Sequence, residues 1–427
     1  MAPAPSRLDR RVLLGFAVSA IGNGLTMPFL YVYLAHVRDL GPSTTGWLFA
    51  WIGLVGVVVA PALGSLMDRF GPRLVMMCGL GVEVVSVGSL GFVDEIVPVM
   101  LALAGLVVGA APLWPGTTAL LALVVAPERR EGVYGLVFLA VNAGLGLGGV
   151  VGAALIDVSR LGSFQVLYVA DACSYLVYAV VLATLPRGVG RTPSGEQCLE
   201  GGWREVVADR RVMALLACGV LAVTFGYGQF EAGASAYVVE VAGLPAQVLG
   251  WGFAANTLVI VASQLLVLQL TAHRRRTAVL AFAVATWSVA WVVVGLSAAV
   301  PGWWAIAAVV IGLGVFGLGE TLWAPVATGL VNTLAPAHLR GRYNAALGLV
   351  WTLGQVFGPA IAGVLIGHGH GGTWVAVVVG GTLLSALLLA SLRRRLTPEE
   401  DGLPARRGSQ CGPLDERPRH VTKVRQS

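Results

Sequence analysis

Long apolar runs dominate this chain of 427 residues and restrict it to one class of fold. A helix crosses the hydrocarbon core of a membrane with about 20 consecutive apolar residues. Runs of this length recur twelve times, so the sequence predicts an all-α polytopic membrane protein with twelve transmembrane helices. The expected spans are residues 12–36, 45–67, 73–92, 97–126, 133–156, 164–185, 211–235, 245–270, 277–299, 303–332, 344–367 and 373–392. The fourth and tenth spans contain Pro115 and Pro325, at which a membrane helix often kinks.

The overall composition excludes a soluble protein. Hydrophobic residues make up 56% of the chain and charged residues 12%, whereas a typical soluble domain is about 25% charged. The 57 glycines suit helices that approach each other closely in lipid. A soluble chain of this length would need far more polar surface.

Basic residues are distributed unevenly between the predicted loops. Of the 28 Lys and Arg residues, only Arg38 and Arg160 fall in loops on one side of the membrane. All the others fall at the termini or in loops on the opposite side. Cytoplasmic loops of membrane proteins carry the excess of Lys and Arg, so both termini are expected to be cytoplasmic. The net charge of +6 therefore requires no nucleic-acid partner.

Signatures of enzymes and of metal sites are missing from the sequence. It contains no P-loop, no H-E-x-x-H and no G-x-S-x-G nucleophile elbow. The five cysteines include no C-x-x-C pair and are expected to be reduced thiols. His368 and His370 are close in sequence, but two histidines alone do not make a metal site. We therefore expect no enzymatic activity, no cofactor and no metal.

A polar segment divides the chain into two sets of six spans that resemble each other. Gly22-Asn23-Gly24 matches Gly226-Tyr227-Gly228 at an offset of 204 positions, and Tyr33 matches Tyr237 at the same offset. Such duplication is typical of transporters that bind substrate between two halves near the membrane midplane. The sequence therefore predicts two pseudo-symmetric six-helix bundles. The expected divisions are 1–185 for the N-terminal bundle, 186–210 for a cytoplasmic linker with a short amphipathic helix at 203–208, 211–395 for the C-terminal bundle, and 396–427 for a disordered cytoplasmic tail.

A short charged motif, residues 64–73, lies between the second and third spans. Gly71-Pro72 predicts a tight turn, and the charged side chains require water or an ion partner. The motif resembles the G-x-L-x-D-R-x-G-R-R loop between the second and third transmembrane helices of the major facilitator superfamily of secondary transporters. This resemblance implies the major facilitator fold and a cytoplasmic gate that latches one state of the transport cycle. The matching residues are Gly64, Leu66, Asp68, Arg69, Gly71 and Arg73.

Small residues recur at helical spacing in the fifth and eleventh spans. The pattern resembles the G-x-x-x-G-P-x-x-G-G motif of drug/proton antiporters in this superfamily, with Gly149 in place of the first proline. The resemblance implies a helix contact that favours export; ordinary close packing of helices is the alternative. The residues concerned are Gly144, Gly148 and Gly152 in the fifth span, and Gly354, Gly358 and Pro359 in the eleventh.

Four acidic side chains fall inside predicted spans, and no Lys or Arg lies well inside a span to neutralise them. They are Glu83, Asp171, Glu231 and Glu320. A carboxylate at the centre of a membrane costs about 2.5–3.5 kcal/mol on insertion scales and is a functional candidate by default. Desolvation penalises the charged form, so each acid is a candidate for coupling transport to protons. A local helix contact is the alternative for each of them.

Amide and aromatic side chains in the spans are candidates for the wall of a substrate cavity. Such a cavity with one or two acids suits a lipophilic cation, through charge attraction and cation–π contacts. Taken singly, each aromatic residue could instead mark a membrane interface. The candidates are Asn23, Met27, Trp114, Asn142, Tyr227, Gln229, Asn256 and Trp323.

The predicted function is export of small amphipathic or drug-like molecules by proton antiport with alternating access. In many proton-coupled exporters of this superfamily the fourth span carries an arginine in an R-x-x-Q-G pattern, but residues 100–109 here contain none. We therefore expect Glu231 and Glu320 to carry the coupling. One alternative is an uptake permease or uniporter for a small nutrient, which the missing arginine supports. Another is a transport-inactive sensor or scaffold, against which the buried acids speak.

The expected partners are a small-molecule substrate, protons and membrane lipids. A monomer is expected, because alternating access needs only one chain. The Arg-rich, Lys-poor usage suggests a bacterial source, and hence the bacterial cell (inner) membrane as the location.

Overall fold

The computed structural model describes residues 7–124, 127–185, 203–271, 274–336 and 339–403, and these fold into helices joined by short turns, without a strand. Eleven helical segments among them are long and apolar enough to cross a membrane. The eighth expected span coincides with a further long helix, α12 (Gln247–Thr271), which is not one of those eleven. The all-α membrane fold is thus confirmed, and the count is close to the expected twelve.

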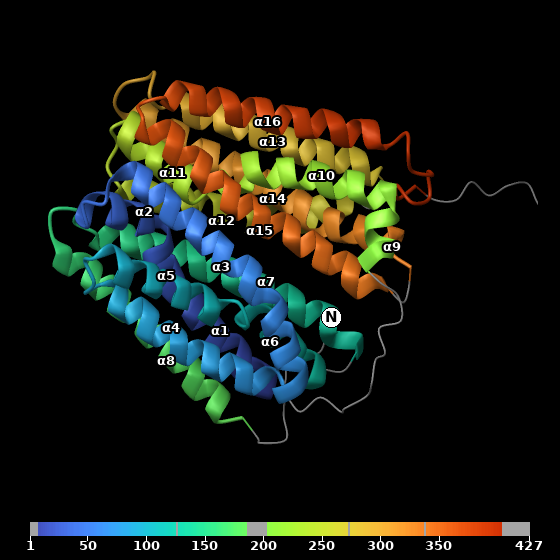
Figure 1. Ribbon diagram of the computed structural model, residues 1–427, viewed down its shortest axis with the longest axis horizontal. Coiled ribbons are helices and arrows are strands. Elements are labelled where there is room, and N and C mark those ends of the chain that lie inside the picture. The colour runs from blue at the N-terminus through green and yellow to red at the C-terminus, as the bar shows by residue number, and fades with distance from the viewer. Residues whose placement is uncertain (1–6, 125–126, 186–202, 272–273, 337–338, 404–427) are drawn as a thin grey trace, which may run out of the picture.

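The N-terminal half occupies one side of the molecule (Figure 1). The fourth expected span is interrupted before Leu113, next to Pro112, whose missing N–H cannot continue a helix. The elements of this half are α1 (Arg7–Thr26), η1 (Met27–Phe29), α2 (Leu30–Val32), η2 (Tyr33–Val37), α3 (Gly41–Phe70), α4 (Pro72–Leu90), α5 (Ile96–Ala110), α6 (Leu113–Val124), α7 (Pro127–Leu155) and α8 (Leu161–Ala183).

The C-terminal half lies against the first. The tenth span is one continuous helix that contains Pro325. Besides α12, the elements are α9 (Trp203–Ala208), α10 (Arg210–Phe225), η3 (Tyr227–Gln229), α11 (Ala232–Ala236), η4 (Tyr237–Val241), α13 (Arg276–Leu296), α14 (Trp303–Leu334), α15 (Arg340–Gly367) and α16 (Gly371–Leu392). The helix α9 matches the short helix expected at 203–208.

The first span of each half changes its helical winding in the same way. The first span contains the 3₁₀ turn η1 and ends in the π-helical turn η2, and the seventh span contains η3 and ends in η4 in the same way. The two π turns lie 204 positions apart. Tyr33 Oη donates to the carbonyl of Leu90 at 2.6 Å, and its counterpart Tyr237 donates to the carbonyl of Gly295 at 2.9 Å. The offset is the one that the sequence repeat predicts, so the pseudo-symmetry of the halves is confirmed.

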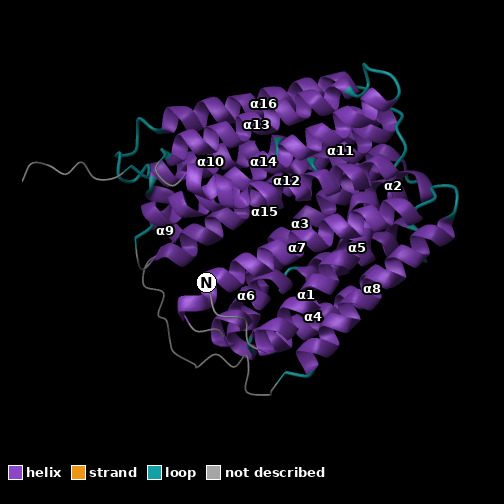
Figure 2. Ribbon diagram, turned by 180° about the vertical axis from the view of Figure 1, so that it is seen from behind, coloured by secondary structure: helices purple, strands orange, loops and turns teal. Residues whose placement is uncertain are grey.

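The two halves meet along two helix pairs, α3 with α15 and α7 with α12. Gly46 and Gly363 lie so close that a Cβ added to either would collide with the backbone of the other. Gly250, the repeat counterpart of Gly46, makes the equivalent close contact with Ala153 and Gly149. The ribbons converge at the end that holds the π turns, here called the π-turn end, and separate towards α9, the linker end (Figure 1, Figure 2).

The charged motif forms the connection between α3 and α4 at the linker end. Gly71 has a φ of 82°, in the left-handed region that favours glycine. Arg73 Nη2 donates to the carbonyl of Ala183 at 3.0 Å, which ties α4 to the end of α8. Arg69 is exposed. Gly64 and Asp68 lie in α3, but their surroundings fall outside the described part of the chain, so the latch remains a prediction.

The glycines of both packing motifs stand where helices touch. The first set packs on the end of α1 and on η1, and the second set packs on α10 and η3. A Cβ added at Gly148 would collide with backbone atoms of Ile21 and Gly24, and one added at Gly358 would collide with the backbone of Gly228. Pro359 follows inside α15. Each motif therefore lets a helix approach the first span of its own half.

Residues 397–403 fold back onto the C-terminal half, although a disordered tail was expected from residue 396. The carboxylate of the buried Asp401 accepts hydrogen bonds from the backbone N–H (2.8 Å) and the hydroxyl (2.9 Å) of Thr277. This caps the first turn of α13 from a distant point in the chain. The fold of this half therefore includes residues 397–403, and residues 404–427 lie outside the described part.

Candidate functional site

A cavity of about 260 Å³ lies between the two halves. Asn23 and Tyr227, which are repeat counterparts, face it from opposite sides, and so do the counterparts Met27 and Glu231. The walls of the cavity therefore use equivalent positions of the two halves. The lining residues are Asn23, Gly24, Met27, Pro28, Asn142 and Leu145 from the N-terminal half, and Tyr227, Phe230, Glu231, Phe253, Asn256, Thr257 and Glu320 from the C-terminal half.

Two carboxylates line this cavity from the C-terminal half. Glu231 stands in the interruption of the seventh span, between η3 and α11, and Glu320 lies in the middle of α14. Asn256 Nδ2 lies 3.5 Å from Glu320 Oε2. The two acids are close enough for their charges to interact with each other and with Tyr227. No basic side chain is among the described residues that line the cavity, so the pair suits the binding of a proton or of an organic cation.

Aromatic rings form the cavity wall beside these acids. The ring centroids of Phe230 and Phe253 are 4.5 Å apart, and those of Tyr227 and Phe230 are 6.0 Å apart. Phe316 stacks behind Phe230 at 4.9 Å and holds it in place. Ring faces carry negative potential and attract a cation within about 6 Å, so the wall adds to the attraction of the carboxylates.

Five of the eight predicted cavity residues line this cavity, and three do not. The five are Asn23, Met27, Asn142, Tyr227 and Asn256. Trp114 lines a neighbouring pocket of about 190 Å³ that shares Asn23 and Leu145 with the central cavity. Trp323 is buried against Trp287 in the C-terminal half. Gln229 is fully buried, and its amide bonds to the backbone of Thr224 and Gly358 and to the indole of Trp374.

The two remaining acids lie elsewhere. Glu83 of α4 and Asp171 of α8 are buried inside the N-terminal half and do not line the central cavity. The sequence placed all four acids in spans, but it carried no information about which cavity each one faces.

Several cavity residues escaped the sequence analysis. Asn256 and Thr257 lie three and four positions after Phe253 on α12, so the three residues share one face, and helical spacing could have found Phe253 and Thr257. Phe230 follows the 3₁₀ turn η3, where the helical period is broken and spacing gives no direction.

Two related six-helix membrane bundles with a polar cavity between them define a membrane transporter. The chain belongs to the Major Facilitator Superfamily, whose family model matches residues 12–323 and 243–425. The resemblance stated from the charged motif is thus confirmed, and with it the class of a multi-pass membrane transporter.

Curated relatives cover the chain to different extents. An uncharacterised MFS-type transporter of Bacillus subtilis, YqjV, is 26% identical over 398 residues, which are 91% of this chain and 94% of YqjV. The quinolone resistance protein NorA of Staphylococcus aureus is 27% identical over 224 residues, which are 52% of this chain and 55% of NorA.

Solved structures share the fold at low identity. The nucleoside transporter NupG has a TM-score of 0.70 and 12% identity, over 91% of this chain and 100% of that chain. The peptide transporter POT in complex with sulfate has a TM-score of 0.70 and 14% identity, over 91% of this chain and 94% of that chain. At these identities the likeness concerns the fold alone.

Proposed function

We propose that this protein exports small amphipathic compounds, lipophilic cations in particular, in exchange for protons. One observation carries the proposal: Glu231 and Glu320 share a cavity between the halves with an aromatic wall and without a basic side chain among the described lining residues. An organic cation is attracted by the carboxylates and by the ring faces. A proton neutralises the same carboxylates, so cation and proton compete for one site.

Antiport follows from this competition. When the cavity opens outward, a proton binds Glu231 or Glu320 and the cation leaves. Rocking of the halves then opens the cavity inward, the proton leaves, and a new cation binds. The partial similarity to NorA, which is named for quinolone resistance, supports export of drug-like compounds.

Charge supports the orientation that this scheme requires. The described arginines gather at the linker end, apart from Arg38 and Arg160 at the π-turn end, so the linker end faces the cytoplasm of a bacterial cell. The cross-half contacts at the π-turn end then close the outer face, and this conformation opens inward. Asp68 and Arg69 latch the cytoplasmic side in the opposite state. A single chain in the membrane suffices for this transport cycle.

The test is accumulation of a fluorescent lipophilic cation in efflux-deficient bacteria that express wild type, Glu231→Gln or Glu320→Gln. Wild-type cells should accumulate less dye than empty-vector cells, and a protonophore should abolish this difference. Each glutamine variant should lose export, because the amide binds neither the proton nor the cation charge. Glu95→Gln, which changes an exposed acid outside the cavity, is the matched control and should export like wild type.

Two results would count against the proposal. Protonophore-sensitive export that survives in both glutamine variants would remove these acids from the coupling. Equal accumulation in wild-type and empty-vector cells, at confirmed expression, would contradict export of lipophilic cations and favour a nutrient permease.

A further inference from the structure

A second acidic site lies inside the N-terminal half, apart from the central cavity. Glu83 and Asp171 are 0% and 1% exposed, and they are close enough for their charges to interact. Asp171 is also close enough to act on Tyr168 and Tyr175 of α8. Tyr33 and Arg38 act on Tyr168 from the π-turn end. The helix α5, which packs on α4, contains no titratable residue, and the charged residues of α1, which packs on α8, lie in its first five positions, far in sequence from Thr26. The pair therefore has no close cation from these helices to balance two negative charges.

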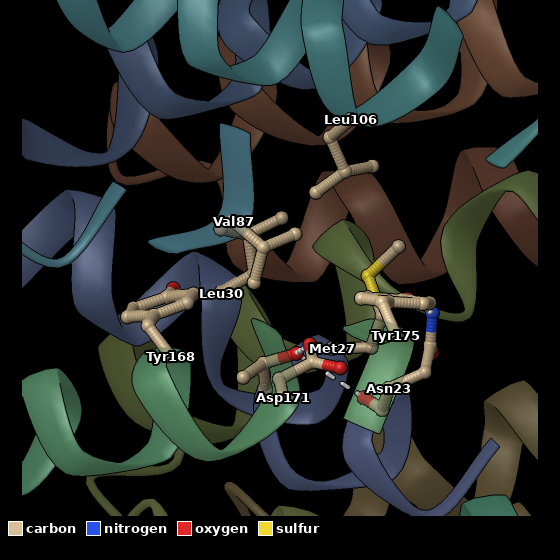
Figure 3. A pocket seen from close by; sticks show the side chains of 9 residues that line it. Asn23, Met27, Leu30, Val87, Leu106, Tyr168, Asp171 and Tyr175 are labelled. Carbon is tan, nitrogen blue, oxygen red and sulfur yellow. Dashed lines mark hydrogen bonds between the residues drawn. The ribbon is translucent and has the colours of Figure 1, made fainter. Parts of the chain in front are cut away.

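Asp171 is connected to the first span at the point where its winding changes. Its Oδ2 accepts a hydrogen bond from the hydroxyl of Thr26 at 2.7 Å. Figure 3 shows Asp171 in its pocket beside Met27 and Asn23. Thr26 is the last residue of α1, and the next residue, Met27, lines the central cavity. Asn23, one turn earlier, donates to the hydroxyl of Tyr175 at 3.2 Å. A change at Asp171 therefore acts on the N-terminal wall of the cavity.

Glu83 has a buried carboxyl group without support. Neither of its side-chain oxygens has a hydrogen-bond partner in the described part of the chain. An ionised carboxylate in this position would lose its hydration and gain no donor in return, which costs far more than burial of the neutral acid. The site therefore holds a proton, on Glu83 or shared with Asp171.

Two glycines face the acids, and because they have no side chain, the carboxyl groups have room to pack there. A Cβ added at Gly109 of α5 would lie 2.6 Å from Glu83 Cγ, and one added at Gly22 of α1 would lie 2.6 Å from Asp171 Oδ1. The helices are in close contact where these carboxyl groups lie. The acids are thus part of the packing between α1, α4, α5 and α8, and do not sit at its margin.

The pocket beside Asp171 limits the kind of ligand. Its volume is about 10 Å³, at the lower limit for a single water molecule. An organic cation does not fit there, whereas a proton does. Asn23 and Met27 line both this pocket and the central cavity, so they mark the way between the two.

We infer that Asp171 and Glu83 form a second proton-binding site in the N-terminal half, filled from the central cavity past Asn23 and Met27. The pair holds one proton and takes up another, which neutralises Asp171 and weakens its bond to Thr26 at the end of α1. As a step in transport, this inference rests on the proposed proton antiport. Proton binding itself is a property of the resting protein and can be measured without transport.

The test is infrared difference spectroscopy of the purified full-length protein, which reports the C=O stretch of carboxyl groups that change protonation. The window runs from about pH 6 to about pH 8, above the range in which exposed carboxyls titrate. The protein used carries both Glu231→Gln and Glu320→Gln, so that the two acids of the central cavity cannot contribute a carboxyl band. This double variant is the background for the further substitutions. We expect a titrating carboxyl band in this background, and its loss when Asp171→Asn or Asp171→Asn with Glu83→Gln is added. Glu95→Gln is the matched control and should leave the band unchanged.

Three results would overturn the inference. They are a background protein without a titrating band, a band that persists in the Asp171 and Glu83 variants, and a band that disappears when sodium replaces choline at constant pH. The last result would make the site one for sodium. The measurement on the background protein needs no substitution in the N-terminal half. It therefore tests the inference even if the Asp171 and Glu83 variants fail to fold. A failed export assay would leave the band in place, which separates this inference from the proposed function.

Discussion

Gln229 uses every polar atom of its side-chain amide inside the C-terminal half. Its nitrogen donates to the carbonyls of Thr224 (2.9 Å) and Gly358 (3.0 Å), and its oxygen accepts from Trp374 Nε1 (2.9 Å). Gln229→Leu would leave buried polar groups unpaired, each at about 1–3 kcal/mol. We therefore expect a clearly lower melting temperature in detergent for this variant.

Asn142→Leu is the contrasting variant, because Asn142 is a half-buried amide of the cavity wall. It should change transport of the lipophilic cation more than it changes the melting temperature. If Gln229→Leu melts with the wild type, the amide network contributes nothing and the residue has another role.

The sequence could not predict which way each side chain of the site points. Asn23, Gln229 and Trp323 all read as polar or aromatic positions inside spans, yet one lines the cavity and two pack inside the C-terminal half. In an unbroken helix the spacing of 3.6 residues per turn relates the directions of the side chains along one span. The 3₁₀ and π turns shift that period in the spans that hold Asn23 and Gln229. Trp323 lies in the continuous helix α14, and its packing against Trp287 sets its direction.

At the scale of elements, the close contact between α15 and the seventh span predicts a difference between two glycines of one helix. A Cβ at Gly358 would lie 2.6 Å from the carbonyl oxygen of Gly228, and this backbone cannot yield locally. Gly358→Ala should therefore destabilise the protein by at least the 1–3 kcal/mol that is roughly typical of overpacking. Gly348→Ala should be neutral or stabilising, because nothing lies within 4 Å and Ala favours a helix over Gly by about 1 kcal/mol.

The measurement is the yield of monodisperse protein and its melting temperature for the two alanine variants in parallel. Equal behaviour of both would mean that α15 can move away from η3 at no cost.

Spans were predictable because the membrane fixes their length, and the repeat was predictable because its offset is constant over separated matches. The breaks within spans were not. The π turns depend on contacts such as that of Tyr33 with the end of α4, far away in sequence. The same holds for Asp401, whose carboxylate caps α13 from a segment that composition alone marks as polar and disordered.

At the scale of the whole molecule, one acid links the two halves at the π-turn end. Glu240 Oε1 accepts a hydrogen bond from Tyr31 Oη at 3.1 Å and lies 2.8 Å from His36 Nε2. Position 36 and position 240 are repeat counterparts, so the link lies where equivalent ends of the first and seventh spans meet. Nearby, Gln247 Nε2 donates to the carbonyl of Ile156 at 3.2 Å, a second contact between the halves.

Glu240→Gln should shift the protein towards states in which the π-turn end is open. A partly exposed pair of this kind contributes about 0.2–1 kcal/mol, so the ratio of open to closed molecules should rise by up to about fivefold. Distances between spin labels at Gly162 and Ala299, exposed positions of opposite halves near this end, would report the shift in a cysteine-free background. Asp157→Asn changes an acid of the same end that pairs only within the N-terminal half among the described residues, and it should leave the distances unchanged.

The glycine contacts make the opposite result informative. If Glu240→Gln keeps the distances of the wild type, closure of the π-turn end depends on the other contacts between the halves, chiefly those of α3 with α15 and of α7 with α12. Gly250→Ala would then separate the halves, because its Cβ would lie 2.5 Å from the Gly149 carbonyl oxygen and from Ala153 Cβ. If both links contribute, the double variant should open further than either single one, since the sites lie on different helices and their free energies should add approximately.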